Sequence, residues 1–222
     1  MPAVVTTKPS IRYADLQKGY RRKRGVADVI REEGSWSEEE YFDLDEGCLL
    51  EFTHGNVEVL PMANPSHQRI VSFLFRLLHE FVMSHGLGDI VFAPMPVRIG
   101  SKEYREPDIA FLSADHAELE EAECWGGADL VVEVVSKGAP KRDLIQKRKE
   151  YAKAGISEYW IVQPQESVVL VLNLKGRSYQ ERRFQLGDIA TSQRLAGFEV
   201  AVADLFGAGN PFKPQRKNGK KS

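Results

Sequence analysis

The chain is poor in cysteine and histidine, and it has no long apolar run. Its 222 residues include two cysteines and five histidines, and Cys48 and Cys124 fit no metal-ligand spacing. We therefore expect reduced thiols in a cytoplasmic protein. No stretch approaches the roughly 20 apolar residues of a membrane span. The first ten residues lack the apolar core of a signal peptide. These absences argue against a cysteine-based metal site, an export signal and a membrane partner.

A strong charge of one sign is also missing. The formal net charge is −2, so any nucleic-acid surface must be a local patch. Apolar residues make up 42% of the chain and charged residues 28%, which is ordinary for a soluble globular protein. A chain of this length can bury a sizeable core. No Cys/His or Ser/His pair stands out as a nucleophilic site.

The chain divides into one folded domain and two basic ends. Residues 35–207 carry the regular hydrophobic patterns and are expected to form the domain. Residues 1–34 are an irregular N-terminal extension with a basic run at 18–24. Residues 208–222 are a basic, polar tail that we expect to be disordered. The basic run is either a solvated surface or an arm that contacts phosphates.

The stretch from residue 129 to residue 164 organises the rest. Residues 130–135 form a continuous apolar run apart from Glu133, which is typical of a strand buried on both faces. Residues 141–154 are rich in helix formers and end at Gly155, and residues 158–162 form a second apolar run. This order predicts a crossover unit with two parallel, neighbouring strands.

Helices and antiparallel strands are expected around this unit. Ser37 and Glu40 form a capping box at the start of a short helix. The remaining elements expected are helices at 66–84 and 114–122, hairpins at 49–60 and 168–184, and strands at 90–93, 95–99 and 195–202. Together they predict the α/β class (α+β), with a mixed β-sheet flanked by helices and an extra N-terminal helix and hairpin.

Two carboxylates lie inside apolar runs, where an isolated charge is expensive. Glu133 interrupts the run at 130–135, and Asp108 precedes the run at 109–112. Two such groups on two strands could share one divalent cation, because hard cations take oxygen ligands. Alternatively, each carboxylate is tied to an arginine or a backbone amide.

The helix expected at 141–154 supplies candidate cations. On a helical wheel, Leu144, Ile145, Tyr151 and Ala152 form one apolar stripe. Lys147 borders this stripe, one turn from Asp143 and from Tyr151. Arg148 falls inside the stripe, where it must snorkel, pair or reach the site. Lys149 and Lys153 point away, as solvated lysines do.

The order of these residues resembles a known family. The Pro107-Asp108 pair followed by Glu133-Val134-Val135-Ser136 is similar to the PD-(D/E)XK nuclease superfamily, although Val135 occupies the usual lysine position. Asp143, Lys147 and Tyr151 at spacings of four, followed by Gly155 and Glu158-Tyr159-Trp160, resemble one branch. This branch is the Uma-type family of restriction endonucleases, in which the catalytic lysine lies on the following helix. The resemblance covers about residues 37–206.

The resemblance implies a restriction endonuclease-like fold and a metal-dependent site. Asp108, Glu133 and the backbone carbonyl of Val134 would hold Mg²⁺ or Mn²⁺, and Lys147 would be the catalytic cation. Glu51, in Leu50-Glu51-Phe52-x-x-Gly55, matches a further catalytic residue of the family. From residue type alone, Glu51 would be a surface strand residue, and Glu58 is the competing carboxylate.

Two other candidates remain open. His67, in the first turn of its expected helix, either touches a phosphate or is a solvated or capping residue. Lys102, Tyr104 and Arg105 form either a cationic loop at a phosphate site or a solvated loop.

The implied activity is hydrolysis of DNA phosphodiester bonds. DNA is the expected partner, and a homodimer is one possible assembly. Two alternatives stay open: a non-catalytic nucleic-acid-binding relative, and an interaction protein whose buried carboxylates are structural.

Overall fold

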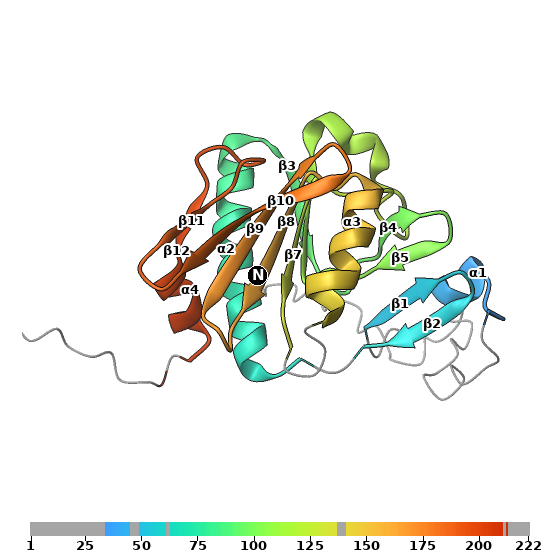
Figure 1. Cartoon of the computed structure of the whole chain (residues 1–222). Helices are drawn as coiled ribbons and strands as arrows, with labels where there is room; N and C mark the ends of the chain where they lie inside the picture. Colours follow the sequence, from blue (N-terminus) through green and yellow to red (C-terminus); the bar gives the residue numbers. More distant parts are fainter. Residues whose placement is uncertain (1–33, 45–48, 61–62, 137–140, 211, 213–222) are drawn as a thin grey trace, which may run out of the picture.

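A mixed six-stranded sheet forms the centre of the molecule (Figure 1). The computed structural model describes residues 34–44, 49–60, 63–136, 141–210 and 212. The strands lie in the order β10 (Ser178–Gln185), β9 (Val168–Lys175), β8 (Glu158–Gln163), β7 (Leu130–Val134), β6 (Ile109–Ser113) and β3 (Gly88–Phe92). β7 and β8 are parallel, and the other neighbours are antiparallel. The predicted crossover unit and mixed sheet are therefore confirmed.

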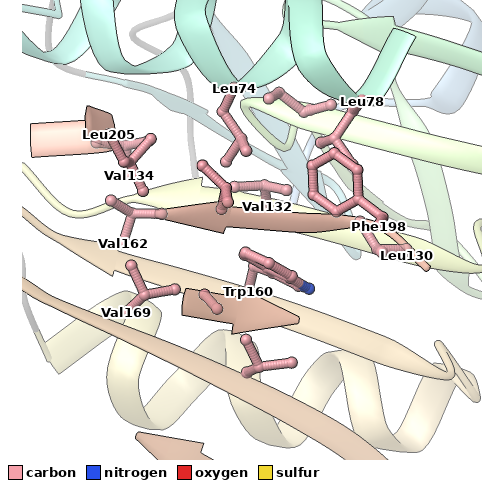
Figure 2. Packing of buried hydrophobic residues seen from close by; sticks show 14 of the residues in the cluster. Leu74, Leu78, Leu130, Val132, Val134, Trp160, Val162, Val169, Phe198 and Leu205 are labelled. Atoms are coloured by element: carbon pink, nitrogen blue, oxygen red, sulfur yellow. The ribbon is translucent and has the colours of Figure 1, made fainter. Parts of the chain in front are cut away.

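Helices cover both faces of this sheet, which explains the unbroken apolar runs. Val132 and Val134 of β7 pack with Leu74 and Leu78 of the helix α2 (Pro65–His85) on one face (Figure 2). On the other face, alternate β7 residues pack with Tyr151 of α3 (Arg148–Ala154). Glu133 belongs to the α3 face, because strand side chains alternate. The helix α4 (Val202–Ala208) and the two-stranded sheet of β11 (Ile189–Thr191) and β12 (Glu199–Ala201) pack on the α2 face.

A second, four-stranded sheet stands beside the first. Its strands lie in the order β2 (Asn56–Val59), β1 (Leu50–Thr53), β5 (Glu103–Arg105) and β4 (Val97–Gly100). The short helix α1 (Glu38–Phe42) packs Tyr41 against Phe52 and Tyr104, and its predicted capping box is present. Between β5 and β6 the chain passes from the small sheet to the large one through Glu106, Pro107 and Asp108.

Several expected elements differ in the structure. Residues 103–105, expected in a loop, form β5, because Tyr104 and Arg105 are both buried against β1. β4 begins at Val97, two residues later than expected. The helix expected at 114–122 is a 3-10 helix over Ala114–Leu119. The strand β11 was not expected, because its three residues show no clear alternation of apolar and polar side chains. Short elements carry too little periodicity to be predicted reliably.

The helix after β7 differs most. Its first part is a π-helix over Arg142–Lys147, and only Arg148–Ala154 is α-helical. Hydrogen bonds from residue i to i+5 widen the turn, so a wheel with 3.6 residues per turn misplaces the side chains. Ile145, predicted in the buried stripe, is 53% exposed. Arg148, expected to snorkel, pair or reach the site, lies near the surface and pairs with Glu181. Lys147, predicted at the edge, is fully buried.

In the part of the chain that the structure describes, no helix is both long enough and apolar enough to cross a membrane. The basic run at 18–24 and residues 213–222 of the tail lie outside the described residues. Ala208, placed at the start of the tail, is the last residue of α4.

Candidate functional site

The site lies where the two sheets meet, at the end of β7. Four parts of the chain converge there: the hairpin of β1 and β2, the link from β5 to β6, the first turn of α2, and the π-helix. They line a cavity of about 140 Å³. Its charged and polar lining residues are Glu58, His67, Glu106, Asp108, Glu133, Ser136, Arg142, Asp143 and Lys147.

The Lys147 ammonium is surrounded by carboxylates. Its Nζ lies 2.8 Å from Glu133 Oε1, 3.1 Å from Glu51 Oε1 and 3.6 Å from Asp143 Oδ1. Burial lowers the pKa of Lys147, but these carboxylates outweigh burial and raise it above its ordinary value. The lysine is therefore a permanent cation in the site.

Glu133 is held on one side only. Its Oε1 accepts hydrogen bonds from Lys147 Nζ at 2.8 Å and from the Tyr151 hydroxyl at 2.7 Å. Burial raises the pKa of Glu133 to about 8, against the opposing effect of Lys147. Among the described residues, Oε2 has no hydrogen-bond partner. It is also not among the buried atoms without a partner, so it remains open to solvent.

Asp108 is held in the same one-sided way. Its Oδ2 accepts a hydrogen bond of 2.7 Å from the backbone N–H of Val134 and lies 3.1 Å from His67 Nε2. Its Oδ1 has no hydrogen-bond partner within the described chain and is not buried. The expectation of a backbone amide partner is thus met for one oxygen, and the other oxygen is free.

His67 is neither solvated nor a side-chain cap. Asn64 caps α2 by accepting from the His67 backbone N–H, while the buried imidazole of His67 faces Asp108. Burial lowers the pKa of His67, but Asp108 and the Val134 backbone raise it by more, so the pKa lies above its ordinary value. His67 thus neighbours two of the three predicted metal ligands.

Glu51 is 1% exposed, which corrects the residue-based expectation of a surface position. Arg105 Nε lies 3.4 Å from its Oε2, which also bonds Arg142, and Lys147 lies at its Oε1. Three cations therefore share this carboxylate. Glu58, the competing candidate, is exposed at the rim and pairs with Arg142.

The sequence did not single out Arg142 or the role of Tyr151, and it placed Arg105 in a loop. Arg105 Nε also lies 3.0 Å from Glu150, so it links the small sheet to α3. Tyr151 was expected to be a core residue. Its hydroxyl donates to Glu133 in the site, whereas the hydroxyl of another buried tyrosine, Tyr179, donates to the Ile156 backbone carbonyl. The available signal was the spacing of four residues between Asp143, Lys147 and Tyr151, which places three polar groups on one line of the helix.

Two other buried carboxylates, Glu158 and Asp129, are fully satisfied by the protein. Both oxygens of Glu158 accept hydrogen bonds, from Trp160 Nε1, Asn173 Nδ2, Ser192 Oγ and the backbone N–H groups of residues 193 and 194. Both oxygens of Asp129 are likewise engaged, by Ser113, His116 and Arg194. Asp108 and Glu133 differ from these structural carboxylates because each keeps one free oxygen.

Asp108, Glu133 and Val134 line one pocket, and carboxylate and carbonyl oxygens are the hard ligands that Mg²⁺ or Mn²⁺ takes. Across the described residues, no group of three or more His, Cys, Asp or Glu side chains is arranged to hold a metal ion. Mg²⁺ is commonly bound by one or two carboxylates, with water and phosphate oxygens completing its shell. The donor set therefore fits such an ion.

Comparisons with known proteins bear on the fold and the family. A crystal structure of a putative nuclease belonging to DUF820, from Anabaena variabilis, is similar with a TM-score of 0.64 and 18% identity. The match covers 77% of this chain and 97% of that chain, and at this identity it shows the fold alone. Among curated proteins, no match is found. The model of the Uma2 family, described as "Putative restriction endonuclease", matches residues 38–203. The chain therefore belongs to the Uma2 family, as the sequence resemblance indicated.

Proposed function

We propose that this protein is a metal-dependent endonuclease that hydrolyses DNA phosphodiester bonds. One observation carries the proposal: Asp108 and Glu133 each have one oxygen fixed by the protein and one oxygen free, in a pocket that also contains the Lys147 ammonium. The family description favours nucleic acid as the substrate. We further propose a cytoplasmic location, since the buried Cys124 has a free thiol.

Asp108, Glu133 and the Val134 carbonyl would hold Mg²⁺ or Mn²⁺. A divalent cation bound there would lower the pKa of a water molecule and neutralise negative charge on the phosphoryl group. Tyr151 and Lys147 fix Glu133, while the Val134 N–H and His67 fix Asp108. These partners leave the free oxygens pre-oriented, as groups next to metal ligands commonly do.

Lys147 stabilises the negative charge that develops on the phosphate during hydrolysis. It is charged, buried and held by three carboxylates, so little reorganisation is needed during the reaction. Glu51 and Asp143 act as positioning residues for this ammonium. Both oxygens of Glu51 already face cations, with Arg142 at Oε2 and Lys147 at Oε1. Glu51 therefore serves the site through these two residues rather than as a metal ligand.

Incubation of supercoiled plasmid DNA with the protein and Mg²⁺ or Mn²⁺ tests this function. The wild type should nick or linearise the plasmid, and Asp108→Asn should not, because it removes a charged ligand but keeps an oxygen acceptor for Val134. Glu199→Gln, on the exposed part of β12, is a matched control for the loss of one negative charge and should cleave normally.

The outcomes also separate the alternatives. Binding of DNA without cleavage under any divalent cation would favour a non-catalytic nucleic-acid-binding relative. Absence of both metal binding and DNA binding would favour an interaction protein with structural carboxylates. Equal cleavage by wild type and Asp108→Asn would contradict the assigned site.

A further inference from the structure

We propose that Arg142 binds a phosphate of the DNA backbone at the mouth of the pocket, and that the Glu58 carboxylate occupies this position in the free protein. The inference rests on the proposed function, because it takes DNA as the ligand. It assigns a role to two residues that the hydrolytic step itself does not use.

Arg142 lies between two glutamates of one hairpin. Glu51 and Glu58 are direct cross-strand partners in β1 and β2, so their side chains share one face of the hairpin. The Arg142 Nη2 bonds Glu51 Oε2, and Nη1 bonds Glu58 Oε1. One guanidinium thus joins a buried carboxylate on one side and an exposed carboxylate on the other.

The two ion pairs are unequal. Glu51 is almost fully buried, whereas the Glu58 side chain is 62% exposed and that of Arg142 is 17% exposed. Removing a buried partner leaves an uncompensated charge, whereas an exposed ion pair contributes little to stability. An incoming anion therefore displaces Glu58 and leaves Arg142 attached to Glu51.

The position of Arg142 fits a phosphate. It lines the same cavity as Asp108, Glu133 and Lys147, so a ligand at its outer edge adjoins the proposed reaction centre. Its Nε is buried and has no hydrogen-bond partner in the described chain. With Nη2 on Glu51, the Nη1 group that Glu58 occupies can donate a charge-assisted hydrogen bond to a phosphate oxygen. Glu58 then acts as a competing anion on the surface of the protein.

Two opposite substitutions test this competition. Binding of a fluorescent DNA duplex is measured by anisotropy in EDTA, at several salt concentrations, so that no cleavage is required. Glu58→Gln should tighten binding by about two- to fivefold, the size of a weak exposed ion pair. Arg142→Ala should weaken binding and reduce the salt slope by about 0.9, the value for one lost phosphate contact.

The double variant gives the decisive comparison. In the Arg142→Ala background, Glu58→Gln should have no further effect, because its competitor role requires the guanidinium. Glu199→Gln controls for the general effect of removing one negative charge. Arg142→Lys keeps the charge but loses the planar guanidinium that joins Glu51 to the phosphate, so it should bind DNA less tightly than wild type and should fold if Arg142→Ala does not.

Several results would overturn the inference. They are unchanged affinity in Glu58→Gln, the same gain in Glu199→Gln, or the same gain from Glu58→Gln with and without Arg142. A protein that cleaves DNA but shows one of these results keeps the proposed function and loses this inference. If the single and double variants bind DNA as predicted but no cleavage is seen, the inference is supported and the proposed function is contradicted. Absence of DNA binding overturns it.

Discussion

At the scale of single residues, the site depends on which oxygen atoms the protein occupies. Lys147 and Tyr151 both bind Oε1 of Glu133, and Val134 and His67 both lie at Oδ2 of Asp108. Because both partners of each carboxylate lie at the same oxygen, the second oxygen is left free to bind a cation. Fully satisfied carboxylates such as Glu158 have no such asymmetry.

Lys147 is expected to be needed for cleavage but not for metal binding. Lys147→Met keeps the volume of the side chain and removes its charge, so cleavage should fall by about 100-fold or more, as on removing one preorganised donor. The free energy of unfolding should fall by about 3–5 kcal/mol, because buried carboxylates lose their partner. Mn²⁺ binding should persist but weaken, because Lys147, like Tyr151, is a partner of Glu133 and not a ligand. Lys175→Met, at the exposed end of β9, is the control. Wild-type cleavage by Lys147→Met would refute the role.

Tyr151 is expected to position Glu133. Tyr151→Phe removes one hydroxyl donor to Oε1, and Mn²⁺ affinity should fall by about 10–100-fold, as for other partners of metal ligands. Tyr179→Phe is a matched control, because its hydroxyl donates to the Ile156 carbonyl at 2.7 Å, away from the site. Both variants should lose about 1–3 kcal/mol of stability. Equal metal affinity in the two variants would show that Tyr151 is merely structural.

The sequence predicted part of this arrangement. Asp108 and Glu133 stood out because charge is expensive inside apolar runs. Their one-sided hydrogen bonding was not predictable, since it depends on which donors the fold brings to each oxygen. Arg142 had no local signal, and the contact of His67 with Asp108 was not predictable, because their partners, Glu51 and Asp108, are distant in the sequence.

At the scale of elements, the link from β5 to β6 positions the site. Three residues carry the chain between two sheets, so Arg105 meets Glu51 in one sheet while Asp108 reaches β7 in the other. The parallel pair of β7 and β8 was predictable from its long apolar runs. β5 and the π-helix were not, because a three-residue strand and a locally widened turn leave no distinct periodicity.

The 3-10 helix before β7 should make stability depend on pH. His116 Nδ1 lies 3.0 Å from Asp129 Oδ2, and this carboxylate raises the pKa of His116 above its ordinary 6.5. A raised pKa in the folded state adds stability that is fully present below about pH 6.5 and is lost as the pH rises through the folded value. His116→Ala should therefore lower the melting temperature more at about pH 5.5 than at about pH 9. An equal loss at both values would contradict this ion pair.

At the scale of the whole molecule, positive charge gathers locally despite the net charge of −2. A cavity of about 600 Å³ between α3 and β10 is lined by Arg148, Lys149, Lys153 and Arg177, with no acidic residue among its lining. Arg148 and Lys153 also have nearby carboxylates, Glu181 and Glu103. Three of these four basic residues belong to α3, which directly follows Lys147 in the chain.

The double variant Lys149→Ala/Arg177→Ala should weaken DNA binding and lower the salt slope by up to about 1.8, or about 0.9 for each lost phosphate contact. The control Arg69→Ala/Arg76→Ala removes two exposed charges from α2, on the opposite face of the large sheet. Binding titrations at several salt concentrations compare the two. Equal slopes for the two double variants would show that this face has no special role.

The central claim is that Asp108 and Glu133 share one divalent cation through their free oxygens. Isothermal titration of the folded protein with Mn²⁺, without DNA, measures this most directly. The account predicts one binding site per chain in wild type and in Glu58→Gln, and loss of that site in both Asp108→Asn and Glu133→Gln. Failure of the wild type to bind Mn²⁺, or binding that survives in both substituted proteins, would contradict it.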